Sequence, residues 1–400
     1  MKKKTTWIKP RHGMARNILI NIVEPYVKWK YRVQIDKLEY KKDKPYLILM
    51  NHQTAFDQFF IAMAYDGPVY YIATEDIFSL GLISKILSFL VAPIPIKKQT
   101  TDLSAIKNCV KVAKEGGTIA LFPEGNRTFH GKTLYFKPSI IKLIRLIKLP
   151  IAVMRVEGGY GVHPRWSDVV RKGTMHAYPA RIIEVEEYRN MSDEEFYAQL
   201  QKELYVDETH SESQFYHKKN AEYMERFLYV CPHCGLTVYQ SKNDIVECQK
   251  CHQKIRYTTS KRLQPLTATF PFTTIDEWYD YQCTYINNLD LSLYHETPMY
   301  EDRSKFFQVI LYKYKKKLKN DVKLCLYGNR IIVDDMTFHF DTIHSITVLG
   351  KNKLNIYTDD FVYQLKGNKS FNALKYVNIF HHYHNLQKGD LNHHEQFLGL

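Results

Sequence analysis

The stretch PYLILMNHQTAFD, at residues 45–57, decides the fold of the first half of this chain. Residues 45–50 form a short, continuous apolar run, which predicts a strand buried on both faces of a sheet. The run stops at Asn51, so the polar residues that follow lie where the strand ends. A second run of this kind, GTIALF at residues 117–122, stops at Pro123 and leads into the loop FPEGNRTFHGK. Two buried strands therefore each deliver a polar loop to the edge of a sheet.

Strands and helices alternate along the first 205 residues, which predicts an α/β fold with a mainly parallel sheet flanked by helices. Further strands are expected at residues 69–73, 93–96 and 150–156, and helices at residues 78–90, 102–115 and 193–204, the last with Ser192 as its N-cap. We expect this domain to cover residues 1–205 and a polar linker to cover residues 206–226.

The N-terminal segment has the composition of a surface helix. Residues 14–33 mix aliphatic and aromatic side chains with lysines, which predicts an amphipathic helix broken near Pro25. Such a helix can lie on a bilayer or pack on the domain with its basic face in water, and the sequence leaves both open. Residues 77–96, the longest apolar stretch, are interrupted by Lys85, serines and prolines and predict no membrane span. With no secretory leader, we expect a protein that is peripheral on the cytoplasmic face of a membrane.

Length and charge narrow the class of protein. A chain of 400 residues is expected to form two or three domains. Its formal net charge of +14 favours acidic partners, and both nucleic acid and an anionic lipid surface qualify. Charge alone does not choose between them.

His52 and Asp57 are the first candidates for chemistry. They follow a buried strand, and ligands of open α/β folds bind where the parallel strands end. However, His163 and Asp168 have the same spacing in VHPRWSD, and a His near an Asp is more often a plain hydrogen-bonded pair. The spacing alone therefore identifies no site.

The second loop supplies a carboxylate, a glycine and an arginine at Glu124, Gly125 and Arg127. Gly125 allows the backbone to approach an anionic group closely, and Arg127 can hold a phosphate through two parallel hydrogen bonds. The alternative is an ordinary turn with a solvated arginine.

Together, these blocks resemble those of the glycerolipid acyltransferases, the family of the bacterial lysophosphatidate (1-acylglycerol-3-phosphate) acyltransferases. Residues 51–57 resemble the family's NHxxxxD block, and residues 122–127 resemble its FPEGxR block. PIPIKK at residues 93–98 and LPIAVM at residues 149–154 resemble two further blocks, in the family's order. Because the family's HxxxxD precedes its FPEG block, the resemblance excludes His163.

The resemblance implies an enzyme that moves a fatty acyl group from acyl-CoA or acyl carrier protein to the free hydroxyl of a lysophospholipid. The foremost acceptor is 1-acylglycerol 3-phosphate, which would give phosphatidate. His52 would act as the general base and Asp57 would orient it, without an acyl-enzyme. The residues expected to bind the acceptor's phosphate or polar head group are Asn51, Lys98, Glu124, Gly125 and Arg127.

The chain departs from the family pattern in two places. Thr54 stands where many members have serine, and it keeps the hydroxyl. Lys97 and Lys98 stand where many have an arginine, which replaces a bidentate group with a point charge and leaves the acceptor's identity open. Residues 77–91 are a candidate groove for the acyl chain, and Cys109 is expected to be a packed core residue.

Two CxxC pairs, Cys231 with Cys234 and Cys248 with Cys251, follow the linker. Their spacing, with a strand, a turn and a strand between them, predicts a tetrahedral zinc ribbon over residues 227–260. Four thiolates in a closed set indicate a structural Zn²⁺ ion, which helps to fold a segment that has little core of its own.

Residues 261–400 change character and become rich in short alternating runs. Strands are expected at residues 323–327, 330–333, 343–348, 354–357 and 361–365, and a helix at residues 371–383. This β-meander and helix look similar to the pleckstrin-homology or GRAM class. The basic run KYKKKLK at residues 313–319 would suit anionic lipid, or would be a solvated face.

A non-enzymatic alternative competes with the acyltransferase interpretation. The zinc ribbon and the basic tail could bind nucleic acid or a protein partner at the membrane. This alternative explains the charge and the cysteines but not the four blocks in the family's order, so the enzyme is favoured. The expected partners are then a thioester donor, a lysophospholipid acceptor and an anionic membrane surface, and nucleic acid is disfavoured.

Overall fold

The computed structural model describes residues 6–39, 44–74, 77–79, 81–96, 102–311 and 313–388. The chain divides into two compact units. The first unit comprises Met1–Thr128, Lys132–Val162 and Lys172–Glu208, and the second comprises Phe129–Gly131, His163–Arg171 and Thr209–Leu400.

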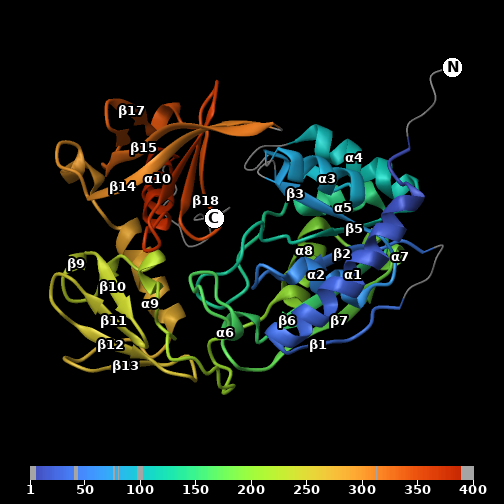
Figure 1. The fold of residues 1–400 in the computed structure, drawn as a ribbon, viewed down its shortest axis with the longest axis horizontal. Coiled ribbons are helices and arrows are strands. Elements are labelled where there is room, and N and C mark those ends of the chain that lie inside the picture. Colours follow the sequence, from blue (N-terminus) through green and yellow to red (C-terminus); the bar gives the residue numbers. More distant parts are fainter. Residues whose placement is uncertain are drawn as a thin grey trace. The chain divides into compact units, whose positions relative to one another are not determined.

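The first unit is built on a seven-stranded sheet of order β1-β7-β6-β2-β5-β3-β4 (Figure 1). All neighbouring strands are parallel except β6 and β7. The strands are β1 Val33–Ile35, β2 Leu47–Met50, β3 Val69–Thr74, β4 Ile94–Ile96, β5 Thr118–Leu121, β6 Ile151–Glu157 and β7 Met175–Ile183. The mainly parallel α/β sheet is therefore confirmed.

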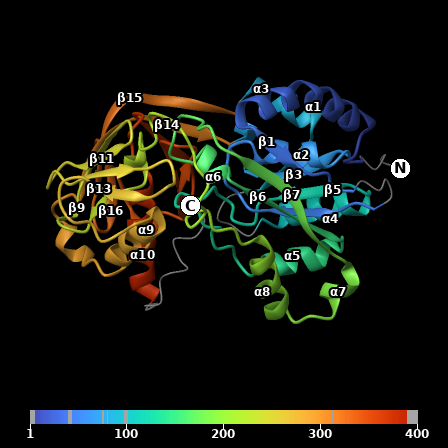
Figure 2. The same cartoon turned by 90° about the horizontal axis from the view of Figure 1, so that it is seen from below.

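Helices cover both faces of this sheet, as Figure 2 shows for α1 on one side and α5 and α8 on the other. The helices are α1 Pro10–Tyr31, α2 Asp57–Ala64, α3 Leu82–Leu90, α4 Leu103–Lys114, α5 Ile140–Ile147, α6 Gly159–Val162, α7 Val185–Arg189 and α8 Asp193–Leu204, with a 3₁₀ turn at Ile77–Ser79. Leu47 and Leu49 of β2 share one core with residues of α4, α5 and α8. Burial on both faces explains why β2 is an unbroken apolar run.

Two helix ends test the sequence predictions. Helix α8 begins as predicted, with Ser192 accepting a hydrogen bond from the Glu195 amide in a capping box. Helix α1 does not break near Pro25, so that prediction was wrong. It begins at Pro10 and runs through Pro25 to Tyr31. Buried residues on both sides of the proline hold the helix against the domain and outweigh the one backbone hydrogen bond that Pro25 cannot donate.

The second unit begins with the cysteine-rich segment. A hairpin of β8 Val230–Cys231 and β9 Gly235–Leu236 is followed by an antiparallel sheet of order β10-β11-β12-β13 and by helix α9, Ile275–Asn287. The four strands are β10 Tyr239–Lys242, β11 Ile245–Cys248, β12 Lys254–Tyr257 and β13 Leu263–Pro265. The predicted arrangement of strand, turn and strand between the cysteine pairs is therefore present.

A seven-stranded antiparallel sheet of order β17-β16-β15-β14-β20-β19-β18, followed by helix α10, Leu374–Lys388, completes the second unit. Its strands are β14 Tyr300–Ile310, β15 Tyr314–Leu326, β16 Arg330–Val333, β17 Met336–His339, β18 Ser345–Leu349, β19 Lys353–Tyr357 and β20 Val362–Gly367; 3₁₀ turns lie at Met224–Arg226, Leu291–Tyr294 and Phe340–Thr342. The predicted meander and helix are confirmed, whereas β13, β14, β17 and α9 were not predicted. The likeness to pleckstrin-homology or GRAM modules stays a prediction.

Candidate active site and cysteine cluster

The candidate site lies at the edge of the first unit's sheet where three neighbouring strands end. Strand β2 pairs in parallel with β5 on one side and β6 on the other. The loops that follow these strands therefore leave the sheet side by side, and they contain His52, residues 122–127 and residues 158–160. The backbone amide of Thr128 donates to the carbonyl of His52 at 3.1 Å, which ties the first two loops together.

His52 and Asp57 form a hydrogen-bonded pair. Nδ1 of His52 lies 2.8 Å from Oδ2 of Asp57, which is fully buried at the start of α2. The same carboxylate accepts hydrogen bonds from the amides of Gln53 and Thr54 at 2.7 and 2.9 Å and from the Thr54 hydroxyl at 2.5 Å. Asp57 is therefore fixed in position and can hold the imidazole in one tautomer.

Phe122 stacks on the His52 ring, with centroids 4.2 Å apart and planes inclined by 19°. The His52 side chain keeps 19% of its surface exposed, so a substrate can reach it. The Phe122 ring covers one face of the imidazole. The sequence analysis did not predict this contact, because Phe122 counted only as the end of an apolar run and as the first residue of the FPEGxR block.

Glu124, in the loop after β5, binds the backbone of two other residues through its carboxylate. One carboxylate oxygen accepts the His52 amide at 2.6 Å, and the other accepts the Leu134 amide at 2.6 Å. Burial raises the pKa of Glu124 to about 8, against the two amides, which favour the charged form. The Glu124 side chain thus holds two backbone amides in place, and its expected contact with the acceptor stays a prediction.

The raised pKa of Glu124 predicts a pH-dependent stability. A carboxyl whose pKa rises from 4.5 to about 8 on folding binds more protons in the folded chain between these values. The free energy of unfolding should therefore fall as the pH rises from about 5 to about 8. Glu124→Gln has no carboxyl at this position and lacks the titration. The difference in melting temperature, wild type minus Glu124→Gln, should therefore fall as the pH rises from about 5 to about 8. A difference that is constant with pH would contradict the raised pKa.

Gly125 and Arg127 lie on the same loop. Gly125 is exposed with a φ of +66°, which favours glycine, and open space surrounds the position of a Cβ. Arg127 is half-buried; burial lowers its pKa, and the nearby Asp57 carboxylate opposes that shift. The loop thus presents accessible backbone beside a cation. Lys98, the other expected cation, lies outside the described residues.

Asn51 bridges two strand ends rather than facing the loop. Its amide nitrogen donates to the carbonyl of Val156 at 2.9 Å, and its oxygen accepts the amide of Val156 at 2.8 Å. The side chain is buried. It therefore holds the ends of β2 and β6 together, while its expected contact with the acceptor stays a prediction.

Gln53 and Glu208, which the sequence analysis did not single out, connect the His52 loop to the loop that follows β6. Gln53 accepts the amide of Tyr160 at 3.0 Å and donates to Glu208 at 3.2 Å, and Glu208 also accepts the amide of Gly158. A Cβ on Gly159 would lie 2.7 Å from the Gln53 side chain, so only glycine allows this approach. Glu208 falls in the predicted linker, yet it is buried.

The pair with the same spacing, His163 and Asp168, belongs to the second unit. Asp168 accepts hydrogen bonds from Arg226 at 2.8 Å and from Lys351 at 3.0 Å. Burial opposes ionisation, but these two cations outweigh it and lower the pKa of Asp168 to about 2. Asp168 thus forms part of an ion-pair network. Cys109 is buried as expected, and burial raises the pKa of its thiol to about 12, which makes it a poor nucleophile.

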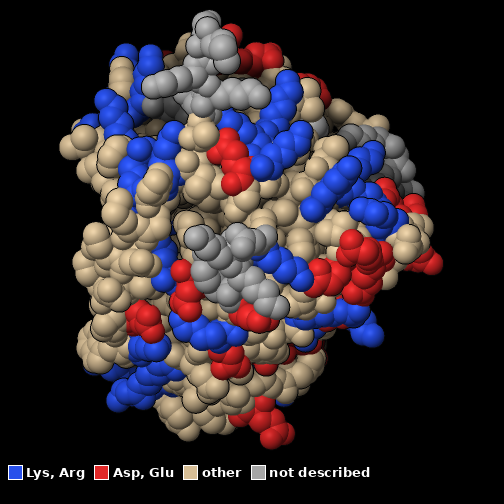
Figure 3. Space-filling model, turned by 90° about the vertical axis from the view of Figure 1, so that its right-hand side faces the viewer, with Lys and Arg blue, Asp and Glu red and all other residues tan. Residues whose placement is uncertain are grey.

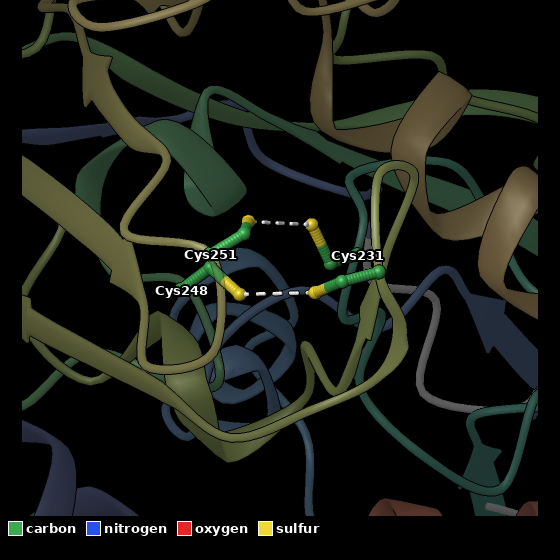
Figure 4. Close-up of side chains that lie close together, drawn as sticks. Cys231, Cys248 and Cys251 are labelled. Carbon is green, nitrogen blue, oxygen red and sulfur yellow. Dashed lines mark hydrogen bonds between the residues drawn. The ribbon is translucent and has the colours of Figure 1, made fainter.

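The four cysteines of the two CxxC pairs come together in the second unit (Figure 4). Their sulfur atoms all lie within 4.8 Å of one another. Sγ of Cys231 lies 3.7 Å from Sγ of Cys251, and Sγ of Cys234 lies 3.5 Å from Sγ of Cys248. Zn–S bonds of about 2.3 Å in a tetrahedron place sulfurs about 3.8 Å apart, so these residues fit a metal ion that has four thiolate ligands.

Comparison with known proteins agrees with the site. The family model described as Acyltransferase matches residues 32–157. A protein named 1-acyl-sn-glycerol-3-phosphate acyltransferase BAT2, chloroplastic, from Brassica napus, is 23% identical over 141 residues, which are 34% of this chain and 41% of that protein. A 1-acyl-sn-glycerol-3-phosphate acyltransferase from Limnanthes alba is 27% identical over 171 residues, which are 42% of this chain and 58% of that protein. The chain thus spans about two fifths to three fifths of these relatives.

A solved structure is also similar, that of the 1-acyl-sn-glycerophosphate (LPA) acyltransferase PlsC from Thermotoga maritima. It is 18% identical with a TM-score of 0.41, and the match covers 49% of this chain and 81% of that one. The segment matched by the family model contains both the His52–Asp57 pair and the loop at residues 122–127. Residues 32–157 are therefore similar to the acyltransferases that this family model describes.

Proposed function

We propose that this protein transfers a fatty acyl group from an acyl thioester to the free hydroxyl of 1-acylglycerol 3-phosphate, which yields phosphatidate. One observation carries this proposal: the His52–Asp57 pair and the Gly125–Arg127 loop leave adjacent parallel strands at the same edge of a sheet. A base and an anion-binding loop are what transfer to a phosphorylated acceptor requires. The names of the similar proteins support the same acceptor.

The pair can perform the transfer by general-base catalysis. Because Nδ1 of His52 faces Asp57, Nε2 takes the proton from the acceptor hydroxyl while its oxygen attacks the thioester carbonyl. The tetrahedral intermediate then collapses, the C–S bond breaks, and the imidazolium returns the proton to the leaving thiolate. Asp57 stabilises the imidazolium between the two proton transfers.

Arg127 and the backbone around Gly125 would hold the acceptor's phosphate. An arginine binds phosphate through two parallel hydrogen bonds, and a loop with an exposed glycine lets backbone amides approach the same anion. Lys98, at the end of the PIPIKK segment, would add a positive charge.

Thiol release tests this function. Purified protein is mixed with long-chain acyl-CoA, or with acyl carrier protein carrying the same chain, and with lysophosphatidate, glycerol 3-phosphate or lysophosphatidylcholine. Release should be fastest with lysophosphatidate and should depend on the acceptor. An absence of release with both donors would overturn the proposal, and a preference for another acceptor would overturn its acceptor assignment.

The first unit also has a surface suited to a bilayer. Helices α1 and α3 are linked by a hydrogen bond of 2.9 Å from the Arg11 side chain to the Phe89 carbonyl. Both helices expose large apolar side chains, which are those of Met14, Ile18, Ile22, Trp29, Leu82, Ile83, Ile86 and Phe89. On one face of the molecule, Lys and Arg side chains gather in the upper half beside broad uncharged areas (Figure 3). Within the described part of the chain, no helix is long and apolar enough to cross a membrane. We therefore propose peripheral binding through α1 and α3.

A pair of charged substitutions tests this surface. Ile22→Asp with Trp29→Asp removes two apolar side chains that are 68% and 76% exposed. Since burying one such side chain contributes about 1.5–3 kcal/mol, binding to vesicles of phosphatidylglycerol should weaken at least tenfold in a sedimentation assay. Leu146→Asp, which makes the same kind of apolar-to-charged change at an exposed position of α5, is the control and should bind like the wild type. Unchanged binding of the double variant would refute the surface.

We further propose that the four cysteines hold a structural zinc ion. Their closed set of sulfur ligands would leave no position for a substrate.

A further inference from the structure

We propose that helices α4 and α5 form a docking surface for an acidic acyl carrier protein, a proposal that rests on the proposed function and names the donor for the same site. Both helices lie within the first unit. A carrier protein holds the acyl chain as a thioester at the end of a flexible arm. It can therefore bind to a helix surface while the chain reaches the site.

Lysines gather on the exposed sides of these two helices. On α4 they recur at i, i+4 and i+7, which is the spacing of one helix face. Helix α5 packs against α4 and has further lysines in it and beside it. The exposed side chains, which we call the lysine face, are those of Lys107, Lys111, Lys114, Lys137, Lys142 and Lys148. Lys107 and Lys114 lie about 10 Å apart along the helix axis, so the face exceeds the size of one phosphate group.

Few carboxylates offset this charge. Residues 103–148 contain nine lysines and arginines but only two acidic residues, Glu115 and Glu124. Glu115 accepts the amides of Trp7 and Ile8 at 2.7 and 2.9 Å, and the buried Glu124 accepts the two amides described above. Both carboxylates are thus engaged with backbone amides. The surface keeps a strong positive charge, which favours an acidic partner.

The stability of the two helices does not account for this arrangement. Lys107 and Lys111 are four residues apart on α4, where like charges destabilise a helix. Lys142 lies in the first turn of α5, where the helix dipole disfavours a cation. By contrast, the first turn of α8 carries three acidic residues, as the dipole favours. Helices α4 and α5 thus accept a small loss of stability, which binding of an acidic partner would offset.

Both helices begin toward the edge of the sheet where His52 lies. Helix α4 ends shortly before β5 begins, and α5 ends shortly before β6 begins. Since β5 and β6 run parallel to β2 and end at that edge, each helix runs back along the sheet, away from the edge. The first halves of α4 and α5, with Lys107 and Lys142, therefore lie nearest to the site. A carrier protein bound there needs only its arm to reach this edge.

The lysine face lies on the other side of the sheet from the exposed apolar surface of α1 and α3. Cys109 and Val112 of α4 share one core with residues of α5 and α8. Figure 2 shows α5 and α8 on the side of the sheet opposite α1. If α1 and α3 bind the bilayer, as proposed above, the lysine face lies on the side away from it. A soluble acidic protein therefore fits this face better than an anionic membrane does.

Kinetics with two donors test the proposal. Lysophosphatidate is the acceptor, and the same acyl chain is supplied either on acyl carrier protein or on CoA. Lys107→Glu with Lys142→Glu should raise the KM for the carrier about tenfold or more and leave the KM for acyl-CoA unchanged. The matched control is Lys172→Glu with Lys242→Glu, which reverses two exposed lysines elsewhere and should change neither KM. An unchanged KM for the carrier, an equal rise for acyl-CoA, or an equal rise in the control would overturn the proposal.

Direct binding separates this proposal from the proposed function, because it requires no turnover. Fluorescence anisotropy of labelled acyl carrier protein should show equal binding to the wild type and the control and about tenfold weaker binding to the double variant. Added salt should weaken the binding to the wild type. No binding to the wild type, or equal binding to all three proteins, would overturn the proposal even if acyl-CoA is a donor. Weaker binding to the double variant alone would support it even if no acyl transfer is found.

Sedimentation with vesicles of phosphatidylglycerol tests the competing partner. The double variant and its control should bind these vesicles equally. A selective loss of vesicle binding in the double variant would assign the lysine face to the bilayer and overturn the proposal. Should the double variant fail to fold, Lys107→Ala with Lys142→Ala removes both charges without reversing them. It should weaken carrier binding to a smaller degree, and unchanged carrier binding would overturn the proposal.

Discussion

Replacement of His52 by alanine should lower kcat about 10²- to 10⁴-fold, the usual contribution of a positioned general base. The KM for both substrates should change little, because His52 is expected to act on the proton and not on the phosphate. The fold should survive, since the His52 side chain is partly exposed while the buried carboxylate of Asp57 keeps its bonds to Gln53 and Thr54. Initial rates and circular dichroism of the purified variant measure both effects.

Asp57→Asn serves as the companion variant. It should also lower kcat, because an amide no longer fixes the imidazole tautomer. Unlike His52→Ala, it should lower the melting temperature as well, since an amide NH₂ group cannot accept the Gln53 and Thr54 amides that the carboxylate accepts. Full activity in His52→Ala would refute the mechanism.

Removal of metal should unfold the second unit as a whole, and this is the second large effect we expect. Cys231 and Cys248, one from each pair, lie in the same hydrophobic core as residues of α9, α10 and the seven-stranded sheet. Binding of a structural zinc ion contributes about 10–16 kcal/mol in small zinc-dependent folds, which is comparable to the whole stability of a domain. The sequence predicts a ribbon at residues 227–260 and a separate C-terminal region. Because the two share one core, we expect them to unfold together.

Backbone groups beside Cys231 explain this coupling. The carbonyl of Val230 accepts the indole of Trp278 at 3.0 Å, and Gln282 of α9 accepts the amide of Tyr229 at 2.8 Å. The Tyr300 hydroxyl at the start of β14 donates to the carbonyl of Tyr229 at 2.8 Å. The residues that precede the first cysteine thus bond to the helix and to the sheet. Loss of their conformation would leave buried polar groups unsatisfied in both.

Chelation with a strong zinc-binding agent, followed by proteolysis and near-ultraviolet circular dichroism, measures the effect. Sites in β14–β20 should become cleavable together with those in β10–β13. Cys248→Ser should behave like the chelated protein, and Cys325→Ser, which alters a buried cysteine of β15 outside the cluster, should behave like the wild type. Cleavage confined to residues 227–260 would contradict the coupling.

The parts of the site that are local in sequence could be predicted, and the parts that depend on distant segments could not. The run LILM followed by NHQTAFD specifies a buried strand, a sharp exit and a helix start within one short segment, so a contact between His52 and Asp57 could be expected there. The choice of this pair over His163 and Asp168 depended on the order of the four blocks. Glu208 reaches Gln53 across 155 residues, and no local pattern marks its carboxylate.

Strand β14 and helix α9 are two of the elements that the sequence analysis did not predict, and each was obscured by its own local sequence. Strand β14 is irregular, with register shifts on either side of Phe306, and buried Ser304 stands among its apolar positions. Its alternation is therefore blurred. Helix α9 carries a readable signal, because Thr274 and Glu277 form a capping box before an aromatic helix; the abundance of tyrosine, which favours strands, masked it.

A balance between the two products tests most directly whether the acyl group is transferred directly with His52 as the base. Wild-type protein, long-chain acyl-CoA and lysophosphatidate are incubated together, and free thiol and phosphatidate are measured in the same samples by colorimetry and mass spectrometry. We expect one phosphatidate for each thiol released, thiol release only when the acceptor is present, and formation of both products slowed about 10²- to 10⁴-fold with His52→Ala. Phosphatidate formed at the wild-type rate by His52→Ala, or thiol released without an acceptor hydroxyl at the same rate, would contradict direct transfer by a His52 base.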